Sequence, residues 1–273
     1  MIKLTDNFED LNLYLNNYHI DTSKPGFYDD LNFIRLEQMI PNFLENYASF
    51  IIKKNYDQTY LQESEEKITK ISNILSNELI KDGRKGACID LSIVMSRILD
   101  LENIWNYPCK GSVTIDFPKE SDITKKYFWS IDYGDFKAGH VWIVSPPFKI
   151  IDLTIQQQAY KMGEENYIPQ IILQKETEIT ELNLSNLISP EVMSQLTIIE
   201  RKNNARILDR INPALKEFYK LFKPEKFTLN STKFIYTPFG ISVSDVALKD
   251  ITSLELNGMS GIEIYNELIK GKI

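Results

Sequence analysis

The hydrophobic pattern of this chain changes its period near residue 105, and this change limits the fold more than any other feature. Before it, apolar residues recur at helical spacing; after it, they alternate with a period of two. Helices are predicted within 1–25 (before a break at Pro25–Gly26), at 29–50 (interrupted at Pro41), at 63–80 and at 86–101. Strands are predicted at 112–117, 127–131, 140–144 and 149–153. Helices followed by antiparallel strands indicate an α+β domain.

The helix at 86–101 is apolar on nearly all sides, so we expect it to be central and buried against the sheet. The preceding helix has one apolar stripe and should end at Lys81-Asp82-Gly83, where a basic last turn meets a glycine.

The last hundred residues give weaker patterns. A helix is predicted at 201–222 with a break near Pro213, and a closing helix at 262–269. Strands at 233–236 and 241–246 are predicted to flank a turn at Pro238–Gly240. We place a boundary near residue 165, so that 166–273 is an α/β extension, either a separate unit or part of the same domain.

Composition limits the class of protein. With 31 basic and 38 acidic residues the net charge is −7, which gives no electrostatic support for binding nucleic acid or an anionic membrane. No apolar stretch is long enough to span a bilayer, and Met1–Asp10 lacks the features of a signal peptide. Two cysteines and no signal favour a reducing cytoplasm, with export by another route left open. No phosphate-loop, dinucleotide or Cys/His metal pattern occurs, so we expect no metal and no cofactor.

Cys88 stands at the start of the predicted buried helix, directly after Gly86-Ala87. The positive end of a helix lowers the pKa of a thiol, and the thiolate is the nucleophile. The free N–H groups there are also suitable donors to an oxyanion. The alternative is an inert buried cysteine, which is our interpretation of Cys109, a small, partly buried residue at the start of a strand.

The chain has two histidines. His19 lies in a polar segment and is predicted to be a surface residue, whereas His140 opens an apolar strand. Asp152 is a lone carboxylate in the next apolar run, a costly position unless it is paired. A hairpin around Ser145-Pro146-Pro147 is predicted to set position 140 opposite 152, so that Asp152 orients His140. The alternative is a buried His–Asp pair without catalysis.

Three motifs carry a resemblance to a known family: Cys88 at a helix start, Gly-His-Val-Trp at 139–142 and Ile-Asp-Leu-Thr at 151–154. In this order they resemble the transglutaminase-like superfamily, a papain-like group that usually has Cys, then His-Ala-Trp, then Asp-Pro-Thr. The resemblance covers residues 83–155, a little over a quarter of the chain. It implies a papain-like core in residues 1–165 and a catalytic triad of Cys88 as nucleophile, His140 as base and Asp152 as orienter. Val141 and Leu153 depart from the family pattern without removing a reacting atom.

A weaker resemblance concerns the run Arg84-Lys85-Gly86-Ala87-Cys88-Ile89-Asp90. It is similar to the Arg-Gly-Gly-x-Cys-x-Glu run of arylamine N-acetyltransferases, although Lys85 and Asp90 differ and the spacing from Cys88 to His140 is long for that family. A local ion pair between Arg84 and Asp90 is the alternative explanation.

Aromatic residues around His140 are candidates for binding substrate. Trp142 shares a strand face with His140 and is a candidate floor of the site, with core packing as the alternative. Trp129 belongs to a group that either lines a cleft or covers the sheet edge, together with Tyr127, Phe128, Tyr133 and Phe136. Candidate suppliers of a second oxyanion donor are Gln58, Tyr60 and Gln62.

The leading hypothesis is an acyl-transfer enzyme that attacks an amide of a protein or peptide and forms a thioester on Cys88. Water as the acceptor would make it a protease or deamidase, which we favour, and an amine would make it a transglutaminase or acyltransferase. The alternatives are an acetyl-CoA-dependent N-acetyltransferase and a binding module of the same fold without activity. The sequence does not indicate an oligomeric state.

Overall fold

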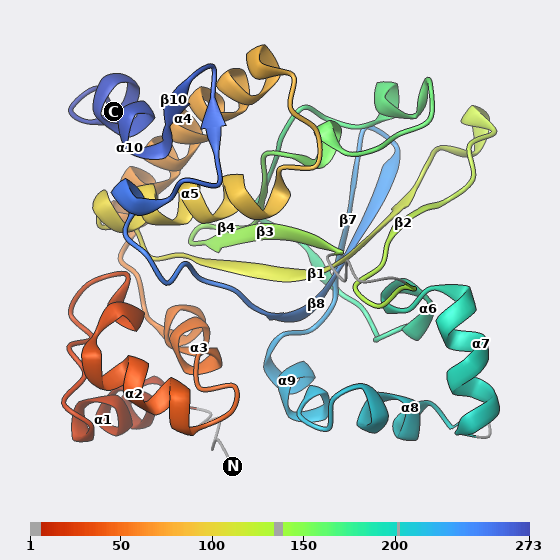
Figure 1. The fold of residues 1–273 in the computed structure, drawn as a ribbon, viewed down its shortest axis with the longest axis horizontal. Coiled ribbons are helices and arrows are strands. Elements are labelled where there is room, and N and C mark those ends of the chain that lie inside the picture. Colours follow the sequence, from red (N-terminus) through yellow and green to blue (C-terminus); the bar gives the residue numbers. More distant parts are fainter. Residues whose placement is uncertain (1–6, 134–138, 201–202) are drawn as a thin grey trace.

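The structure, a computed structural model, describes residues 7–133, 139–200 and 203–273. Helices and an antiparallel sheet form it, as expected of the α+β class (Figure 1). Eight strands make the main sheet: β1 Tyr107–Asp116, β2 Lys126–Phe128, β3 His140–Ser145, β4 Phe148–Asp152, β5 Ile172–Gln174, β6 Glu178–Ile179, β7 Glu225–Leu229 and β8 Thr232–Ile241. Their order is β5-β4-β3-β1-β8-β7-β6, and β2 pairs with β1. Strands from both sides of residue 165 therefore pair in one sheet.

Three short helices precede the sheet: α1 Phe8–Asn17, α2 Leu31–Met39 and α3 Glu45–Lys53. As predicted, Pro41 falls in the break between α2 and α3. Apolar side chains of these helices, such as Leu15, Phe33 and Phe50, share one core with Trp142 and Tyr236 of the sheet. One face of the sheet is thereby covered.

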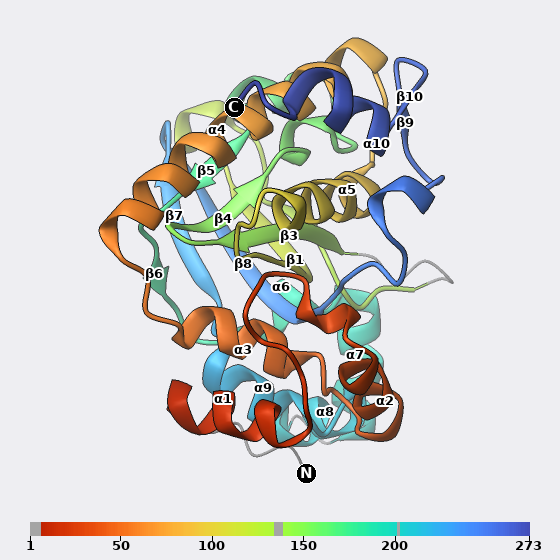
Figure 2. The same ribbon diagram turned by 90° about the vertical axis from the view of Figure 1, so that its left-hand side faces the viewer.

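Two longer helices, α4 Gln58–Asp82 and α5 Cys88–Leu101, contribute side chains to a second hydrophobic core. In it Leu75 of α4 and Ile98 of α5 are buried together with Ile143 and Ile151 of the sheet. Figure 2 shows α5 directly over β3 and β1, with α4 outside it. The start of α5 therefore lies next to the strand that carries His140, and α5 is buried as predicted.

The C-terminal third differs from the prediction at Pro238. Instead of a turn there, β8 runs unbroken from Thr232 to Ile241, and the hairpin turn lies at Asn230–Ser231, where both φ angles are positive. Pro238 is tolerated because it pairs with Gly111 at an irregularity in the β1–β8 register, and bulges admit proline. The strand β7, on the other side of this turn, was not predicted.

The other elements are short. The remaining helices are α6 Leu184–Leu187, α7 Pro190–Ile199, α8 Asn204–Ile211, α9 Leu215–Leu221 and α10 Gly261–Ile264, the last followed by a π-helical turn at Tyr265–Ile269. The predicted break near Pro213 separates α8 from α9. A two-stranded sheet joins β9 Glu255–Leu256 to β10 Met259–Ser260. Single 3-10 turns occur at Phe27–Asp29, Lys119–Ser121, Ile155–Gln157, Glu164–Tyr167 and Leu248–Asp250.

Candidate active site

Cys88 is the first residue of α5 and is 6% exposed. Gly86, two residues earlier, has a φ of +73°, and its N–H donates to the carbonyl of Gln157 at 2.9 Å. This bond fixes the approach to the helix, and a positive φ is readily adopted only by glycine. Ala87 at the N-cap makes no side-chain cap, so no cap side chain occupies the N–H groups beside the thiol.

His140 and Asp152 form a buried pair between β3 and β4. Nε2 of His140 lies 2.6 Å from Oδ2 of Asp152, and both side chains are inaccessible to solvent. The predicted register is wrong, however: Ile143 pairs with Ile151, which sets Asp152 opposite Trp142 rather than His140. The pairing of Ser145 with Phe148 at the turn and the irregularity between Ile143 and Ser145 each shift the ladder by one residue. The pair still meets because diagonal neighbours on one face of a sheet are within reach of long side chains.

Asp152 accepts three further hydrogen bonds. The hydroxyl of Tyr236 donates to Oδ2 at 2.8 Å, and the backbone N–H and hydroxyl of Thr154 donate to Oδ1 at 3.0 and 3.2 Å. Burial acts to raise the pKa of Asp152, but the charge of His140 and these hydrogen bonds outweigh burial and lower that pKa. Asp152 is therefore a carboxylate held in one orientation.

The thiol of Cys88 interacts with the His140 side chain by hydrogen bonding and charge. Burial acts to raise the pKa of Cys88, while hydrogen bonding and charge interaction with His140 and the backbone of Val141 lower it, and the net direction is downward. Conversely, burial opposes the imidazolium, but Asp152 and Cys88 together raise the pKa of His140. Nδ1 of His140 has no hydrogen bond of normal geometry to a described residue, so it remains available to the thiol. The arrangement favours a thiolate–imidazolium pair.

Small residues permit the close packing around His140. A side chain on Gly139 would collide with the carbonyl oxygen of Gly111 and with Ser130, so only glycine fits between β1 and the start of β3. The hydroxyl of Ser92 on α5 donates to the carbonyl of Val141 at 3.3 Å. These contacts fix the distance between the helix that carries Cys88 and the strand that carries His140.

The two tryptophans predicted to bind substrate differ in position. Trp142 is 2% exposed and packs edge-on against Tyr236, with ring centres 5.0 Å apart, so it supports the tyrosine that holds Asp152. Trp129 is half-buried, stacks on Tyr127 and donates through Nε1 to the carbonyl of Ser185 at 2.9 Å. Neither lines the pocket beside His140.

Among the other predicted aromatics that the structure describes, Phe128 lies beside the site. Its ring centre lies 6.0 Å from that of His140, and it also meets Tyr160 edge-on. Tyr133 is exposed, and Phe136 lies outside the described residues.

The predicted oxyanion donors lie elsewhere. Gln58, Tyr60 and Gln62 are in the first turns of the 25-residue helix α4, about 32–38 Å from Gly83 at its other end. The hydroxyl of Tyr60 accepts the N–H of Trp105 at 2.8 Å. Arg84 donates to the carbonyl of Ser253, and in the described part of the chain it makes no ion pair with Asp90. His19 is exposed, as predicted.

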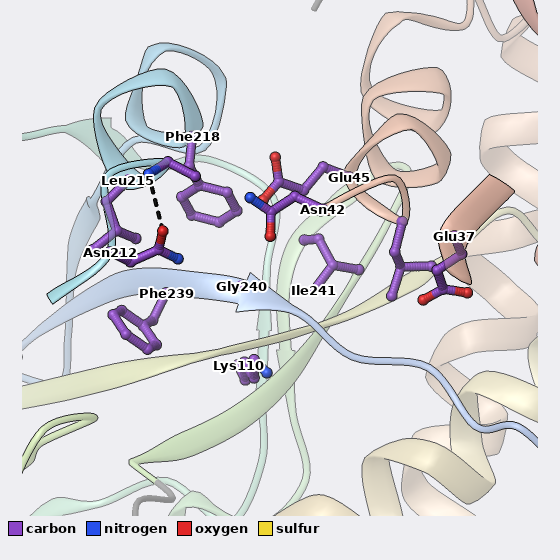
Figure 3. A pocket seen from close by; sticks show the side chains of 12 residues that line it. Glu37, Asn42, Glu45, Lys110, Asn212, Leu215, Phe218, Phe239, Gly240 and Ile241 are labelled. Carbon is purple, nitrogen blue, oxygen red and sulfur yellow. Dashed lines mark hydrogen bonds between the residues drawn. The ribbon is translucent and has the colours of Figure 1, made fainter. Parts of the chain in front are cut away.

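A pocket of about 160 Å³ opens beside His140. Ile89, Val141 and Phe239 give it apolar walls, and Lys110 and Ser242 add polar groups. A neighbouring pocket of about 330 Å³ shares Lys110 and Phe239 with it, and Figure 3 shows Glu45 and Asn42 of this second pocket facing Phe218 across the gap. Burial raises the pKa of Glu45 to about 7. Of these two pockets, the smaller one is the one that borders His140.

Comparisons with known proteins found no match to this chain among family models, curated proteins or solved structures. Within residues 7–133, 139–200 and 203–273, no group of three or more His, Cys, Asp or Glu side chains is arranged to hold a metal ion. No helix in the same ranges is long and apolar enough to cross a membrane.

Of the predicted residues, the structure brings Cys88, His140 and Asp152 together, and it adds Tyr236, Thr154 and Phe128 around them.

Proposed function

We propose that this chain is a cysteine acyl-transfer enzyme with Cys88 as nucleophile, His140 as proton carrier and Asp152 as orienter. The observation that carries the proposal is the use of both ring nitrogens: Nε2 is bound to Asp152, and Nδ1 is left for the thiol that it activates. A papain-like, transglutaminase-like core is supported by the same arrangement, a nucleophile at a buried helix start facing His and Asp on antiparallel strands.

The chemistry follows from these positions. The Cys88 thiolate forms an S–C bond with the carbonyl carbon of an amide, and the C=O electron pair moves to oxygen. N–H groups at the start of α5 stabilise the resulting oxyanion. The His140 imidazolium gives its proton to the leaving amine as the C–N bond breaks, which leaves a thioester on Cys88 and a neutral ring. Water or a second amine, deprotonated by His140, then attacks the thioester and regenerates the thiolate.

A protein or peptide amide is the proposed substrate, and hydrolysis is the proposed outcome, as a protease or deamidase. A cytoplasmic location belongs to the same proposal, because both cysteines are free thiols and a reducing compartment keeps Cys88 active. Transfer to an amine, acetyl transfer from acetyl-CoA, and a module without activity are the competing functions.

The test uses an activated acyl donor, p-nitrophenyl acetate, and mass spectrometry of the intact chain. Attack by Cys88 releases p-nitrophenolate and leaves one acetyl thioester, which peptide mapping assigns to a residue. We expect acetylation of Cys88, none on that peptide in Cys88→Ala, and unchanged acetylation in the matched control Cys109→Ala. Acetyl-CoA in place of the ester separates the competing functions, since rapid acetylation by it would favour the acetyltransferase.

Two results would contradict the proposal. One is a wild-type chain that is not acylated at Cys88 although circular dichroism shows it folded, which would favour the binding module. The other is equal acylation of Cys109 and Cys88, which would mean that the site does not activate its thiol.

A further inference from the structure

A pocket of about 400 Å³, whose lining does not include Cys88 or His140, lies between α3, the β3–β4 turn, β8 and the end of α9. Its walls are mainly apolar, and the residues that form them include Ile51, Tyr107, Val144, Phe222 and Pro238. Its volume falls in the range of small-molecule sites, which typically combine apolar walls with a few polar groups. The pocket is therefore suited in size and lining to the apolar part of a small ligand.

The charged groups of this pocket are mostly cations. Lys54, Lys149 and Lys223 contribute to it, against the single carboxylate of Glu225. Glu225 accepts a hydrogen bond from the hydroxyl of Thr177 at 2.7 Å, whereas Lys149 and Lys223 are exposed and form no ion pair within the described ranges. This local excess of positive charge stands out on a chain whose net charge is −7. An anionic group at the mouth would meet unpaired ammonium groups.

Lys54 shows how a cation is held against apolar surface here. Its Nζ lies 5.0 Å from the centre of the Trp105 ring and 5.7 Å from that of Phe50. Its charge stays unneutralised by any carboxylate in the part of the chain that the structure describes. The rim thus holds a positive charge directly beside the apolar wall.

We propose that this pocket binds an amphipathic anion, a molecule with one apolar tail and a terminal carboxylate. The tail occupies the apolar interior, where burying each methylene contributes about 0.8 kcal/mol, and the carboxylate lies at the lysine rim. Trp142 and Tyr236 also line the pocket, so the tail lies against the tyrosine whose hydroxyl holds Asp152. Binding does not depend on acyl transfer by Cys88, and it is testable separately.

The first experiment measures binding of decanoate to the full chain by isothermal titration calorimetry, with decanol as the neutral control of equal tail length. We expect saturable binding of one decanoate per chain, at least tenfold tighter than decanol. Absence of saturable binding would overturn the proposal. Equal affinity for decanol would also overturn it, because the occupant would then be a neutral apolar molecule.

The second experiment reverses the rim charge with Lys149→Glu together with Lys223→Glu. Both side chains are exposed, so folding should be preserved. We expect decanoate affinity to fall by at least tenfold while decanol affinity changes less than twofold. The matched control, Lys119→Glu with Lys270→Glu, reverses two exposed lysines outside the pocket and should leave both affinities unchanged. An equal loss in both double variants would mean that net charge, not the rim, attracts decanoate.

The third experiment locates the tail with a decanoate analogue that carries a diazirine. Crosslinks after illumination should map to peptides that contain Val144 or Phe222 and should disappear with excess decanoate. Crosslinks confined to other peptides would overturn the assignment of the site.

Discussion

The two cysteines of this chain are both nearly buried, yet their surroundings give them opposite character. Cys88 is 6% exposed and Cys109 is 2% exposed. Burial raises the pKa of Cys109 well above the usual range, and Glu225 adds to the effect. At Cys88 burial acts in the same direction, but His140 reverses the result and the pKa is lowered. The difference teaches that the partner, not the degree of burial, decides in which direction the pKa of a buried thiol shifts.

The positions of the two cysteines within their secondary-structure elements explain this contrast. Cys88 begins a helix, where N–H groups without a capping side chain favour an anion, whereas Cys109 lies inside β1 and its sulfur has a weak contact of 3.9 Å with the carbonyl of Lys110. A thiolate at Cys109 would have no compensating donor of this kind. Each prediction below removes one support of Cys88 or of its partners His140 and Asp152.

The largest effect is expected from His140→Gln. The amide keeps a donor for Asp152 but removes the positive charge, so the pKa of Cys88 should rise and its thiolate fraction at neutral pH should fall. We expect alkylation of Cys88 by iodoacetamide to slow by about a hundredfold. His19→Gln, which changes an exposed histidine, should leave the rate unchanged. A similar rate in both variants would mean that His140 does not activate the Cys88 thiol.

A smaller effect is expected from Asp152→Asn. Asp152 raises the pKa of His140, so removing its charge should move the ring titration to lower pH. The His140 imidazolium then persists over a narrower pH range, and the rate of Cys88 alkylation near neutral pH should fall by about tenfold. NMR titration of the His140 ring in a His19→Gln background measures the shift. An unchanged titration midpoint would show that the carboxylate does not stabilise the imidazolium.

Tyr236→Phe should cost stability more than reactivity. It removes one hydrogen bond to a buried carboxylate, a loss of about 1.5–3 kcal/mol in the free energy of unfolding. Tyr219→Phe is the matched control, because its buried hydroxyl has no hydrogen-bond partner among the described residues and its removal should cost little. Urea denaturation compares the two, and equal losses would mean that the Tyr236 hydroxyl is not a specific support of Asp152.

The candidate-site residues that stand out in their local sequence were predictable, and those that long-range strand pairing brings to the site were not. The helix start at Cys88, the strand at His140 and the unusual carboxylate of Asp152 are local signals in periodicity and composition. Tyr236 is separated from Asp152 by 84 residues and reaches it only because β8 pairs with β1 in the centre of the sheet. No local pattern specifies that pairing.

The errors in the fold have a similar origin. Pro238 was predicted to end a strand because proline lacks an N–H, but an irregular register opposite Gly111 accommodates it. The direct pairing of His140 with Asp152 failed because the turn pairs Ser145 with Phe148, one residue from the predicted register, and the irregularity between Ile143 and Ser145 shifts the ladder by one more. Local propensity predicts that strands exist, whereas register depends on contacts between distant segments.

The most direct test compares alkylation of both cysteines in the same native chain as a function of pH, with peptide mass spectrometry to report each rate. The pKa of Cys88 is lowered, so its thiolate persists as the pH falls below the usual thiol midpoint of about 8.5. We predict that Cys88 reacts faster than Cys109 throughout, with a midpoint below about 8.5 that moves upward in His140→Gln. A midpoint at or above that value, or a Cys88 no faster than Cys109, would contradict an activated nucleophile at the start of α5.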